Sequence, residues 1–130
     1  MRKPAKKISR SKLIKKLDII FSKYIRVKNA DKHGFCTCVT CKKKFHWKSI
    51  QAGHFMSRKH YSTRWNENNV HPQCVGCNMF KQGEQYKYSV FLGPELAEKL
   101  YLQSTKLVKF TNHEINSMIT DYQEKLNRLL

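Results

Sequence analysis

The sequence predicts a single α+β domain, in which a small zinc-stabilised core carries helical extensions at both ends. Three observations support this class. Apolar residues recur at helical spacing near both ends of the 130-residue chain, two CxxC pairs lie in its middle, and short alternating segments typical of strands surround them. A chain of this length buries only a modest core, so a bound metal would add stability. We expect a basic arm and helix over residues 1–33, the core over residues 34–92 and helices over residues 93–130, all in one compact domain.

The N-terminal segment is basic and then amphipathic. Residues 1–12 contain six Lys or Arg and no acidic residue, which indicates a disordered arm. Over residues 11–28 apolar side chains recur every three or four positions, which predicts a helix with one buried face. The residues on that face are Leu13, Leu17, Ile20, Tyr24 and Ile25. The other face carries Lys12, Lys15 and Lys16, which either form a solvated surface or contact phosphates, and the net charge favours phosphates.

Short strands are predicted around the first CxxC pair. Residues 35–47 alternate like two strands that turn at this pair. A further strand is expected over residues 48–55, with Ile50 and Phe55 pointing toward the core. These strands would place the first cysteine pair at a tight turn.

The second half of the core is predicted as a loop followed by a helix. Residues 57–69 are rich in Asn, Ser and Arg, which indicates a loop around a short strand near residues 63–65. A helix is expected to start near Cys74 and to continue past Gly83 through residues 86–92.

The C-terminal part has clear helix signals. Gly93 and Pro94 end one helix and start the next, with proline at its first position. Thr111 and Glu114 have the spacing of a capping box ahead of a last helix. That helix carries one apolar stripe, made of Ile115, Met118, Ile119, Tyr122, Leu126 and Leu129. The stripe, or that of the first helix, would either form a dimer interface or pack within the chain.

The charge of the chain restricts its partners. Lys and Arg number 26 against 9 Asp and Glu, which gives a formal net charge of +17. A polyanion such as DNA or RNA is therefore the first candidate partner, ahead of an anionic membrane surface. No apolar run is long enough for a membrane span, and the N-terminus lacks the pattern of a signal peptide. We expect a cytoplasmic protein without a membrane partner.

Four cysteines form a predicted zinc site. The pair Cys38 and Cys41 precedes the pair Cys74 and Cys77, with 32 residues between the pairs. Thiols stay reduced in the cytoplasm, so this pattern favours a metal over disulfides. Four thiolates at about 2.3 Å from the ion form a closed, structural zinc site. Cys36 faces the same side as Cys38 and is either a packed thiol or a spare ligand.

Polar residues between the two cysteine pairs are candidates for chemistry. His54 is expected at the end of a strand, Asn69 and His71 in a loop, and Asn78 at the start of a helix. This arrangement would bring the four side chains within reach of one another. Cleavage of a phosphodiester needs a base to activate water and a divalent cation to stabilise negative charge. Neutral imidazole is a base near pH 7, and an asparagine oxygen suits Mg²⁺.

The strings AGHF, TRWNENNVHPQC and CNMFKQG resemble the HNH, or ββα-metal, nuclease family over roughly residues 35–92. Within that family they resemble the phage recombination nucleases of the NinG (Rap) type, and the order CxxC, His, CxxC-Asn is similar to phage endonuclease VII, a Holliday-junction resolvase. The resemblance implies that His54 is the general base, Asn69 fixes the loop and Asn78 binds the metal. It also implies that Lys81 faces the phosphate and that the cysteines hold structural zinc.

One position departs from the family pattern. HNH enzymes commonly carry Asp, Glu or His immediately before the base, as a metal ligand, and this chain has Gly53 there. His71 is the preferred substitute because it is expected in the loop beside the helix start. His60 is the second candidate, and His54 itself is a third possible ligand.

Basic and aromatic residues surround the proposed base. Arg58, Lys59 and Arg64 are candidates to bind DNA phosphates. Trp65 either stacks on a base or packs in the core, and core packing is the favoured interpretation.

We therefore expect a metal-dependent, structure-selective DNA endonuclease. Water activated by His54 would attack the phosphorus, while Mg²⁺ or Mn²⁺ held by Asn78 would stabilise the leaving oxygen. The resemblance implies branched DNA, such as a Holliday junction, as substrate, and a phage source with action in the host cytoplasm. Symmetric cutting of a junction needs two active sites, which favours a homodimer. One alternative is a zinc-containing accessory protein that binds nucleic acid without cleaving it, and another is a sequence-specific HNH nuclease.

Overall fold

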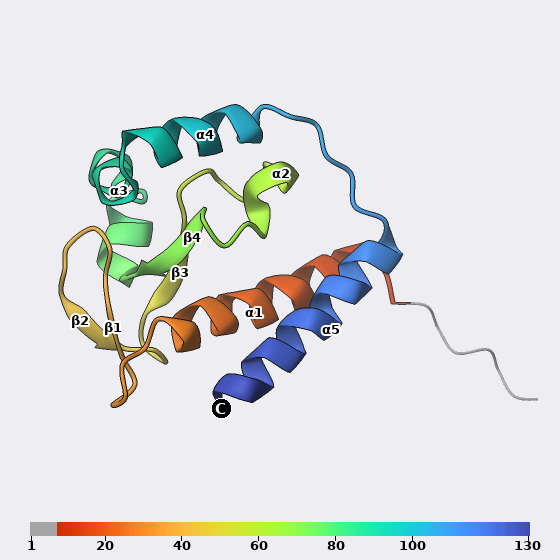
Figure 1. Ribbon diagram of the computed structural model, residues 1–130, viewed down its shortest axis with the longest axis horizontal. Coiled ribbons are helices and arrows are strands. Elements are labelled where there is room, and N and C mark those ends of the chain that lie inside the picture. Colours follow the sequence, from red (N-terminus) through yellow and green to blue (C-terminus); the bar gives the residue numbers. More distant parts are fainter. Residues whose placement is uncertain (1–7) are drawn as a thin grey trace, which may run out of the picture.

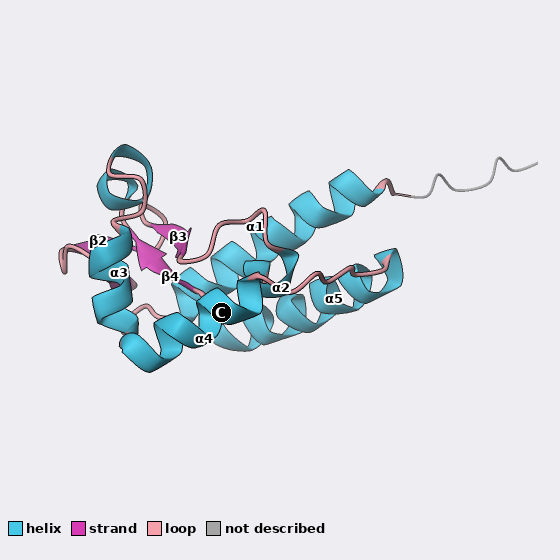
Figure 2. Cartoon of the chain, turned by 90° about the horizontal axis from the view of Figure 1, so that it is seen from above, coloured by secondary structure: helices cyan, strands magenta, loops and turns pink. Residues whose placement is uncertain are grey.

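The fold combines helices with two small antiparallel sheets (Figures 1 and 2). The computed structural model describes residues 8–130, so residues 1–7 of the expected basic arm lie outside the described residues. None of the described helices combines the length and hydrophobicity of a membrane-spanning helix. Along the chain the elements are α1 (Arg10–Lys28), β1 (Phe35–Thr37), β2 (Lys44–His46), β3 (Gln51–His54), α2 (Tyr61–Arg64), β4 (Val70–Gln73), the π-helical turn η1 (Gly76–Phe80), α3 (Gln85–Leu92), α4 (Pro94–Ser104) and α5 (Asn112–Leu129).

Helices α1 and α5 pack against each other along their apolar stripes (Figure 1). The rings of Phe21 and Tyr122 meet edge to face, with centroids 5.0 Å apart. Phe21 is also buried on this face, and Ile20 is half-buried and packs against the same core, so the stripe of α1 contains Phe21 in addition to the expected residues. Leu129 is 47% exposed and lies outside the packed stripe. The α5 stripe is therefore used inside the chain, and a homodimer would need another surface.

The helix ends agree with the capping signals. Ser9 caps α1 through its side chain, which accepts the backbone N–H of Lys12. The helix therefore begins at Arg10, inside the segment that was expected to be an arm. At α5 the capping box of Thr111 and Glu114 is present in both directions, as predicted.

The two hairpins place the cysteines and the candidate histidines. In the first sheet β1 pairs with β2, and the first CxxC pair lies in the turn between them, as expected. In the second sheet Gly53 pairs with His71, and His54 pairs with Val70. The strand expected near residues 63–65 is wrong, because that segment belongs to the short helix α2 and the partner of β3 is β4. The loop folds back on itself there, so that its residues bond locally instead of extending along β3.

The helix expected from Cys74 through residue 92 is interrupted, which corrects that prediction. The backbone has positive φ at Gln82, Gly83 and Glu84, and this turn separates η1 from α3. Tertiary hydrogen bonds hold the turn, since Gly83 donates its N–H to the Cys77 carbonyl at 2.8 Å and accepts from the Gln73 side chain at 2.7 Å. A helix that continued through these positions would lose both contacts.

Candidate functional site

The four predicted zinc ligands come together. The sulfur atoms of the two CxxC pairs all lie within 4.8 Å of one another, and those of Cys41 and Cys74 are 3.8 Å apart. Tetrahedral coordination at about 2.3 Å per bond implies a sulfur–sulfur separation of about 3.8 Å. The geometry therefore suits a zinc ion. Cys36 takes no part, because its thiol donates to the Arg26 carbonyl at 3.1 Å, and it is a packed thiol.

The electrostatics of the cluster also suit a cation. The N–H of Cys74 donates to the Cys38 sulfur at 3.3 Å, and the N–H of Cys77 donates to the Cys74 sulfur at 3.4 Å. Burial raises the pKa of Cys38, but hydrogen bonds from Thr40 and from backbone N–H groups outweigh it and lower that pKa to about 6. Burial together with the neighbouring thiols raises the pKa of Cys74 to about 12. Four thiols this close cannot all ionise alone, and a bound dication removes that conflict.

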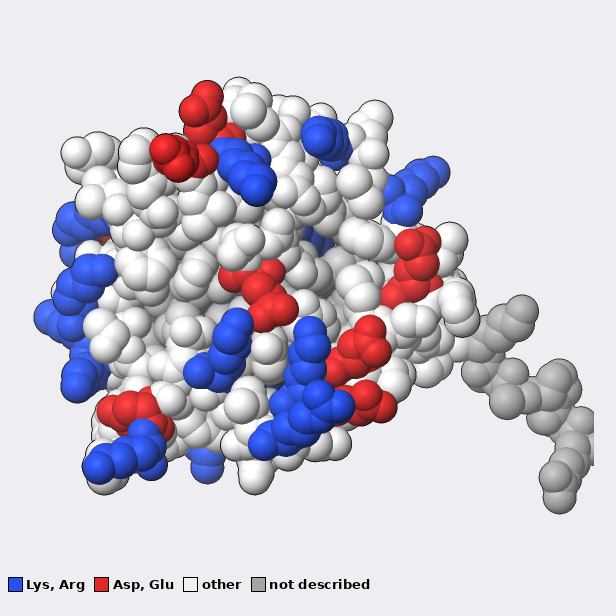
Figure 3. Space-filling view, viewed as in Figure 1, with Lys and Arg blue, Asp and Glu red and all other residues white. Residues whose placement is uncertain are grey.

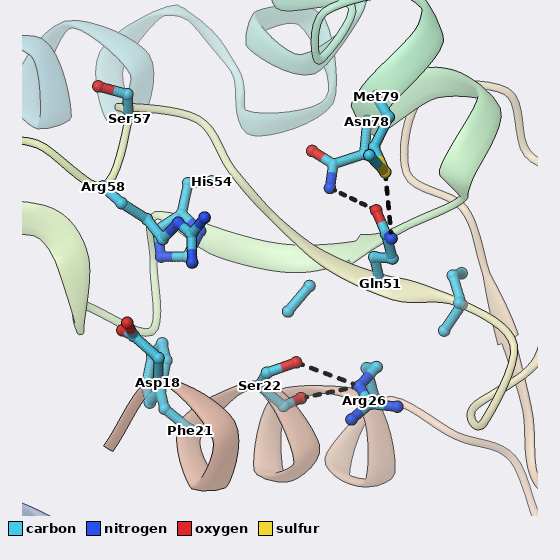
Figure 4. A pocket seen from close by; sticks show the side chains of 12 residues that line it. Asp18, Phe21, Ser22, Arg26, Gln51, His54, Ser57, Arg58, Asn78 and Met79 are labelled. Atoms are coloured by element: carbon cyan, nitrogen blue, oxygen red, sulfur yellow. Dashed lines mark hydrogen bonds between the residues drawn. The ribbon is translucent and has the colours of Figure 1, made fainter. Parts of the chain in front are cut away.

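A cavity of about 730 Å³, with polar and apolar lining residues, lies between α1 and the β3–η1 side of the core (Figure 4). Helix α1 forms one wall, and β3, the loop after it and η1 form the other. Its polar lining residues include Asp18, Ser22, Arg26, His54, Arg58 and Asn78. The predicted base His54, the predicted metal ligand Asn78 and one side of α1 therefore line the same cavity.

His54 has one nitrogen fixed by a hydrogen bond, and its other nitrogen has no hydrogen-bond partner within residues 8–130. Its Nε2 lies 2.9 Å from the backbone carbonyl of Arg64. A carbonyl oxygen can only accept, so Nε2 carries the proton and Nδ1 has a lone pair. Burial lowers the pKa of His54 to about 4, against the opposing effect of the Arg64 carbonyl. The ring is therefore neutral near pH 7, and Nδ1 can take a proton.

A partly buried network holds the Arg64 residue in place. The Arg64 guanidinium donates to both carboxylate oxygens of Asp18, with Nε 3.1 Å from Oδ1, and to the Arg58 carbonyl at 2.7 Å. Trp65 donates its indole N–H to the same Asp18 carboxylate at 2.9 Å. Trp65 is 7% exposed and packs in the core, as favoured. The predicted phosphate contact of Arg64 is thus replaced by an internal ion pair, whereas Arg58 lines the cavity and Lys59 is exposed outside its lining.

Asn78 presents an oxygen at the cavity. It lies on η1 immediately after the last zinc ligand, Cys77, so the cysteine cluster determines its position. Its Nδ2 donates to Gln51 Oε1 at 2.8 Å. Within residues 8–130 its Oδ1 has no hydrogen-bond partner, which leaves that oxygen available to a cation.

Asn69 closes the loop between β3 and β4. It is fully buried, and its Oδ1 accepts the N–H of Met56 at 2.8 Å. Its Nδ2 donates to the carbonyls of Met56 and Thr63, each at 3.0 Å. These contacts match the loop-fixing role that the resemblance implied, and they leave Asn69 no donor for substrate.

His71 is not brought to the cavity. Neighbouring cross-strand pairs point to opposite faces of a sheet, so His71 faces away from the side that His54 occupies. Its Nδ1 lies 3.2 Å from the Tyr88 hydroxyl, and its ring packs edge to face on Phe91. The structure therefore does not bring His71 to the cavity beside Asn78, where the sequence led us to expect it. His60 does not line the cavity either.

Gly53 faces the core and not the cavity. A Cβ at this position would lie 2.8 Å from the Cβ of Gln73, which is fully buried. The Gln73 amide donates to the Thr40 hydroxyl at 3.2 Å and to the Gly83 carbonyl, so it cannot easily move aside. Position 53 thus has no room for a ligand, and glycine is required by packing.

The predicted phosphate-binding lysines differ in position. Lys15 precedes Asp18, Ser22 and Arg26 at spacings of three and four, which places it on the cavity-facing row of α1. Lys12 and Lys16 are exposed on the neighbouring row. On the face in Figure 3, basic side chains gather along the left and lower edges, with acidic ones among them. Lys81, at the end of η1, is exposed, lies 3.8 Å from Glu84 and does not line the cavity.

Sequence reasoning missed the contribution of α1 to the cavity. Asp18, Ser22 and Arg26 recur every fourth residue, and Asp18 is the single acid among the residues of α1. A polar row with a lone acid in a lysine-rich helix was the available signal. The element that this row faces could not be read from the spacing.

The chain is similar to known phage proteins. A family model described as bacteriophage lambda NinG protein matches residues 1–130. The chain is 30% identical over 127 residues to Protein ninG of Escherichia phage lambda, and the match covers 92% of this chain and 58% of that protein. The chain thus spans less than two thirds of the length of that relative. No solved structure matches the chain.

Proposed function

The chain belongs to the bacteriophage lambda NinG protein family, and from this premise we propose that it is an HNH-type DNA endonuclease that cuts branched recombination intermediates. One observation carries the proposal. The contact between His54 and the Arg64 carbonyl leaves an unprotonated Nδ1 in a cavity that Asn78 also lines. A neutral base and a free oxygen ligand in one cavity are what phosphodiester hydrolysis requires of the protein.

In the proposed reaction, His54 acts as general base. Nδ1 takes a proton from a water molecule, which then attacks the phosphorus of the DNA backbone. The bond from phosphorus to the 3′ oxygen breaks, and this oxygen takes a proton from water, which leaves a 3′ hydroxyl and a 5′ phosphate. The Arg64 carbonyl stabilises the resulting imidazolium through the Nε2 proton and keeps the ring oriented. The partly buried network of Asp18, Arg64 and Trp65 would hold this carbonyl during the reaction.

The catalytic cation is part of the proposal. Asn78 Oδ1 would hold it, and it would supply charge stabilisation at the phosphate and the leaving oxygen. The one carboxylate that lines the cavity, Asp18, is already bonded to Arg64 and Trp65. The donor set suits Mg²⁺ or Mn²⁺ that binds mainly through the DNA phosphate and water, with one amide oxygen from the protein. The cysteine-bound zinc would be structural.

The proposed substrate is branched DNA, in the cytoplasm of the phage host. The net charge of +17 favours a polyanion, and contacts to the backbone recognise shape more than sequence. Symmetric cutting of a junction needs two active sites, and so a homodimer belongs to this proposal. Since the α5 stripe packs on α1, the interface would lie elsewhere.

A second candidate function is binding without cleavage. Two observations favour it. The Asp18 carboxylate is already paired with Arg64, and position 53 has no space for a metal-binding side chain. A protein of this kind would share the zinc and the charge and would act as an accessory factor.

To test the proposal, the purified protein is incubated with Mg²⁺ or Mn²⁺ and each of four DNA substrates: linear duplex, flap, fork and four-way junction. We expect metal-dependent incisions near the branch point, mapped on both strands. Binding to all four substrates without incision would support the accessory factor. Incision of linear duplex at defined sequences would instead indicate a sequence-specific nuclease.

A further inference from the structure

Arg26 is a fixed cation in the wall of the cavity. It is half-buried on α1, and its Nε donates to the carbonyl and hydroxyl oxygens of Ser22 at 3.2 and 3.3 Å (Figure 4). One Nη1 proton is donated to the carbonyl of Trp47 at 2.8 Å. The centre of the guanidinium lies 5.7 Å from the Trp47 ring centroid. The thiol of Cys36 bonds to the Arg26 carbonyl, which anchors the backbone as well.

No carboxylate among the described residues neutralises the charge of Arg26. Within residues 8–130 no carboxylate forms an ion pair with it, whereas Arg64, at the end of α2, pairs with Asp18. Burial accordingly lowers the pKa of Arg26. A partly buried cation with neutral partners alone has lost water without gaining an opposite charge, and an anion bound beside it restores the balance.

The donors that remain are arranged for an oxyanion. A guanidinium has five N–H groups in one plane. Nε and one proton of Nη1 are used by Ser22 and Trp47, so three N–H groups remain without a protein partner among the described residues. Adjacent N–H groups of this kind hold two oxygens of one phosphate. Because the ring and the carbonyls keep the side chain in place, little rotamer freedom is lost on binding.

We propose that Arg26 is a DNA-phosphate-binding residue, which holds a backbone phosphate in the cavity that His54 and Asn78 line. The inference deepens the proposed function, since the phosphate it holds would be next to the one that is cut. The contact itself requires only that DNA enters the cavity. Lys15 lies on the same row of α1 and would contact the DNA backbone farther from the cavity.

Binding measured without cleavage tests the contact. Fluorescence anisotropy with labelled four-way-junction DNA, in the absence of added divalent cation, gives Kd at a series of KCl concentrations. Each phosphate contact adds about 0.9 to the slope of log Kd against log salt for duplex arms. We expect Arg26→Gln to weaken binding about tenfold or more and to reduce the slope by about 1.

Arg128→Gln is the matched control. Arg128 is exposed in the last turn of α5 and does not line the cavity, and its replacement removes the same charge. We expect the control to keep the wild-type slope. A wild-type slope for Arg26→Gln, or equal losses in both variants, would overturn the proposal.

Two further comparisons separate loss of the phosphate contact from loss of folding and from loss of cleavage. Arg26→Lys retains the charge but loses the planar fork, so we expect the wild-type slope with weaker binding. If Arg26→Gln does not fold, as judged by thermal unfolding, Arg26→Lys decides: affinity equal to that of Arg128→Lys rejects the contact. A wild-type protein that binds but never cuts would reject the nuclease proposal and leave this measurement valid.

Discussion

Nε2 of His54 lies 2.9 Å from the backbone carbonyl of Arg64, a residue ten positions later in the chain. This contact selects the tautomer in which Nδ1 is free. It also links the proposed base to the ion pair between Arg64 and Asp18 on α1. The chemistry of the cavity therefore depends on helix α1 as well as on the zinc-stabilised core.

Replacing His54 should separate cleavage from binding. We expect His54→Ala to lower the metal-dependent cleavage rate by about 100- to 10,000-fold, as for loss of a general base, while DNA affinity stays within about twofold of wild type. His33→Ala, at an exposed turn, is the control and should cleave normally. Gel assays of cleavage and anisotropy of binding provide the two readouts. Full activity of His54→Ala would remove it from the mechanism.

The buried position of His54 predicts its titration. Burial lowers its pKa to about 4, so the folded chain binds this proton less tightly than the unfolded chain does. The contribution of His54 to stability is therefore present above the unfolded pKa of about 6.5 and is lost as the pH falls toward 4. An NMR titration of the His54 ring should give a midpoint near 4. A midpoint near the unfolded value would show that the ring is solvated.

Asp18 should act as a positioning residue. Asp18→Asn keeps the shape of the side chain but removes the charge that holds Arg64, so the Arg64 carbonyl becomes less well placed for His54. We expect cleavage to fall about 10- to 100-fold, as for loss of an orienting partner, with DNA binding retained. The His54 titration should change in the same variant, which a purely structural effect elsewhere would not cause. Asp121→Asn, exposed on α5, is the control.

The cysteines differ in what they should contribute to metal binding. We expect about one zinc per chain by elemental analysis, since four ligands form one closed site. Cys77→Ala should lose zinc and cooperative unfolding, because it leaves an incomplete site in the core. Cys36→Ala should retain zinc, since this thiol bonds to the Arg26 carbonyl instead. Zinc loss in Cys36→Ala would make Cys36 a ligand.

Gly53 should resist substitution for steric reasons. Gly53→Ala places a methyl group against Gln73, and we expect a loss of about 1–3 kcal/mol in the free energy of unfolding. Gly76→Ala is the matched control, because its nearest contact would be 3.8 Å away. Urea denaturation measures both. An unchanged free energy of unfolding in Gly53→Ala would show that position 53 has room for a side chain and could hold a metal ligand.

Local signals predicted several elements correctly. Helical spacing and the capping box predicted α5, and the CxxC spacing predicted the sulfur cluster. These features depend on residues close in sequence or on ligand chemistry that repeats between proteins. The resemblance placed His54 and Asn78 in one site, and both line the same cavity.

Periodicity, cysteine spacing and residue chemistry were enough to predict the packed helices, the cysteine cluster and the residues that could act as base and ligand. Which of these residues meet depends on long-range contacts in the folded chain. Strand parity turned His71 to the face opposite His54, since a shift of one residue reverses the face of a side chain. Bonds from distant residues to Gly83 interrupted the expected helix, and packing of α1 brought Arg26 to the cavity. Such contacts join residues far apart in the chain, and their geometry exists only after folding.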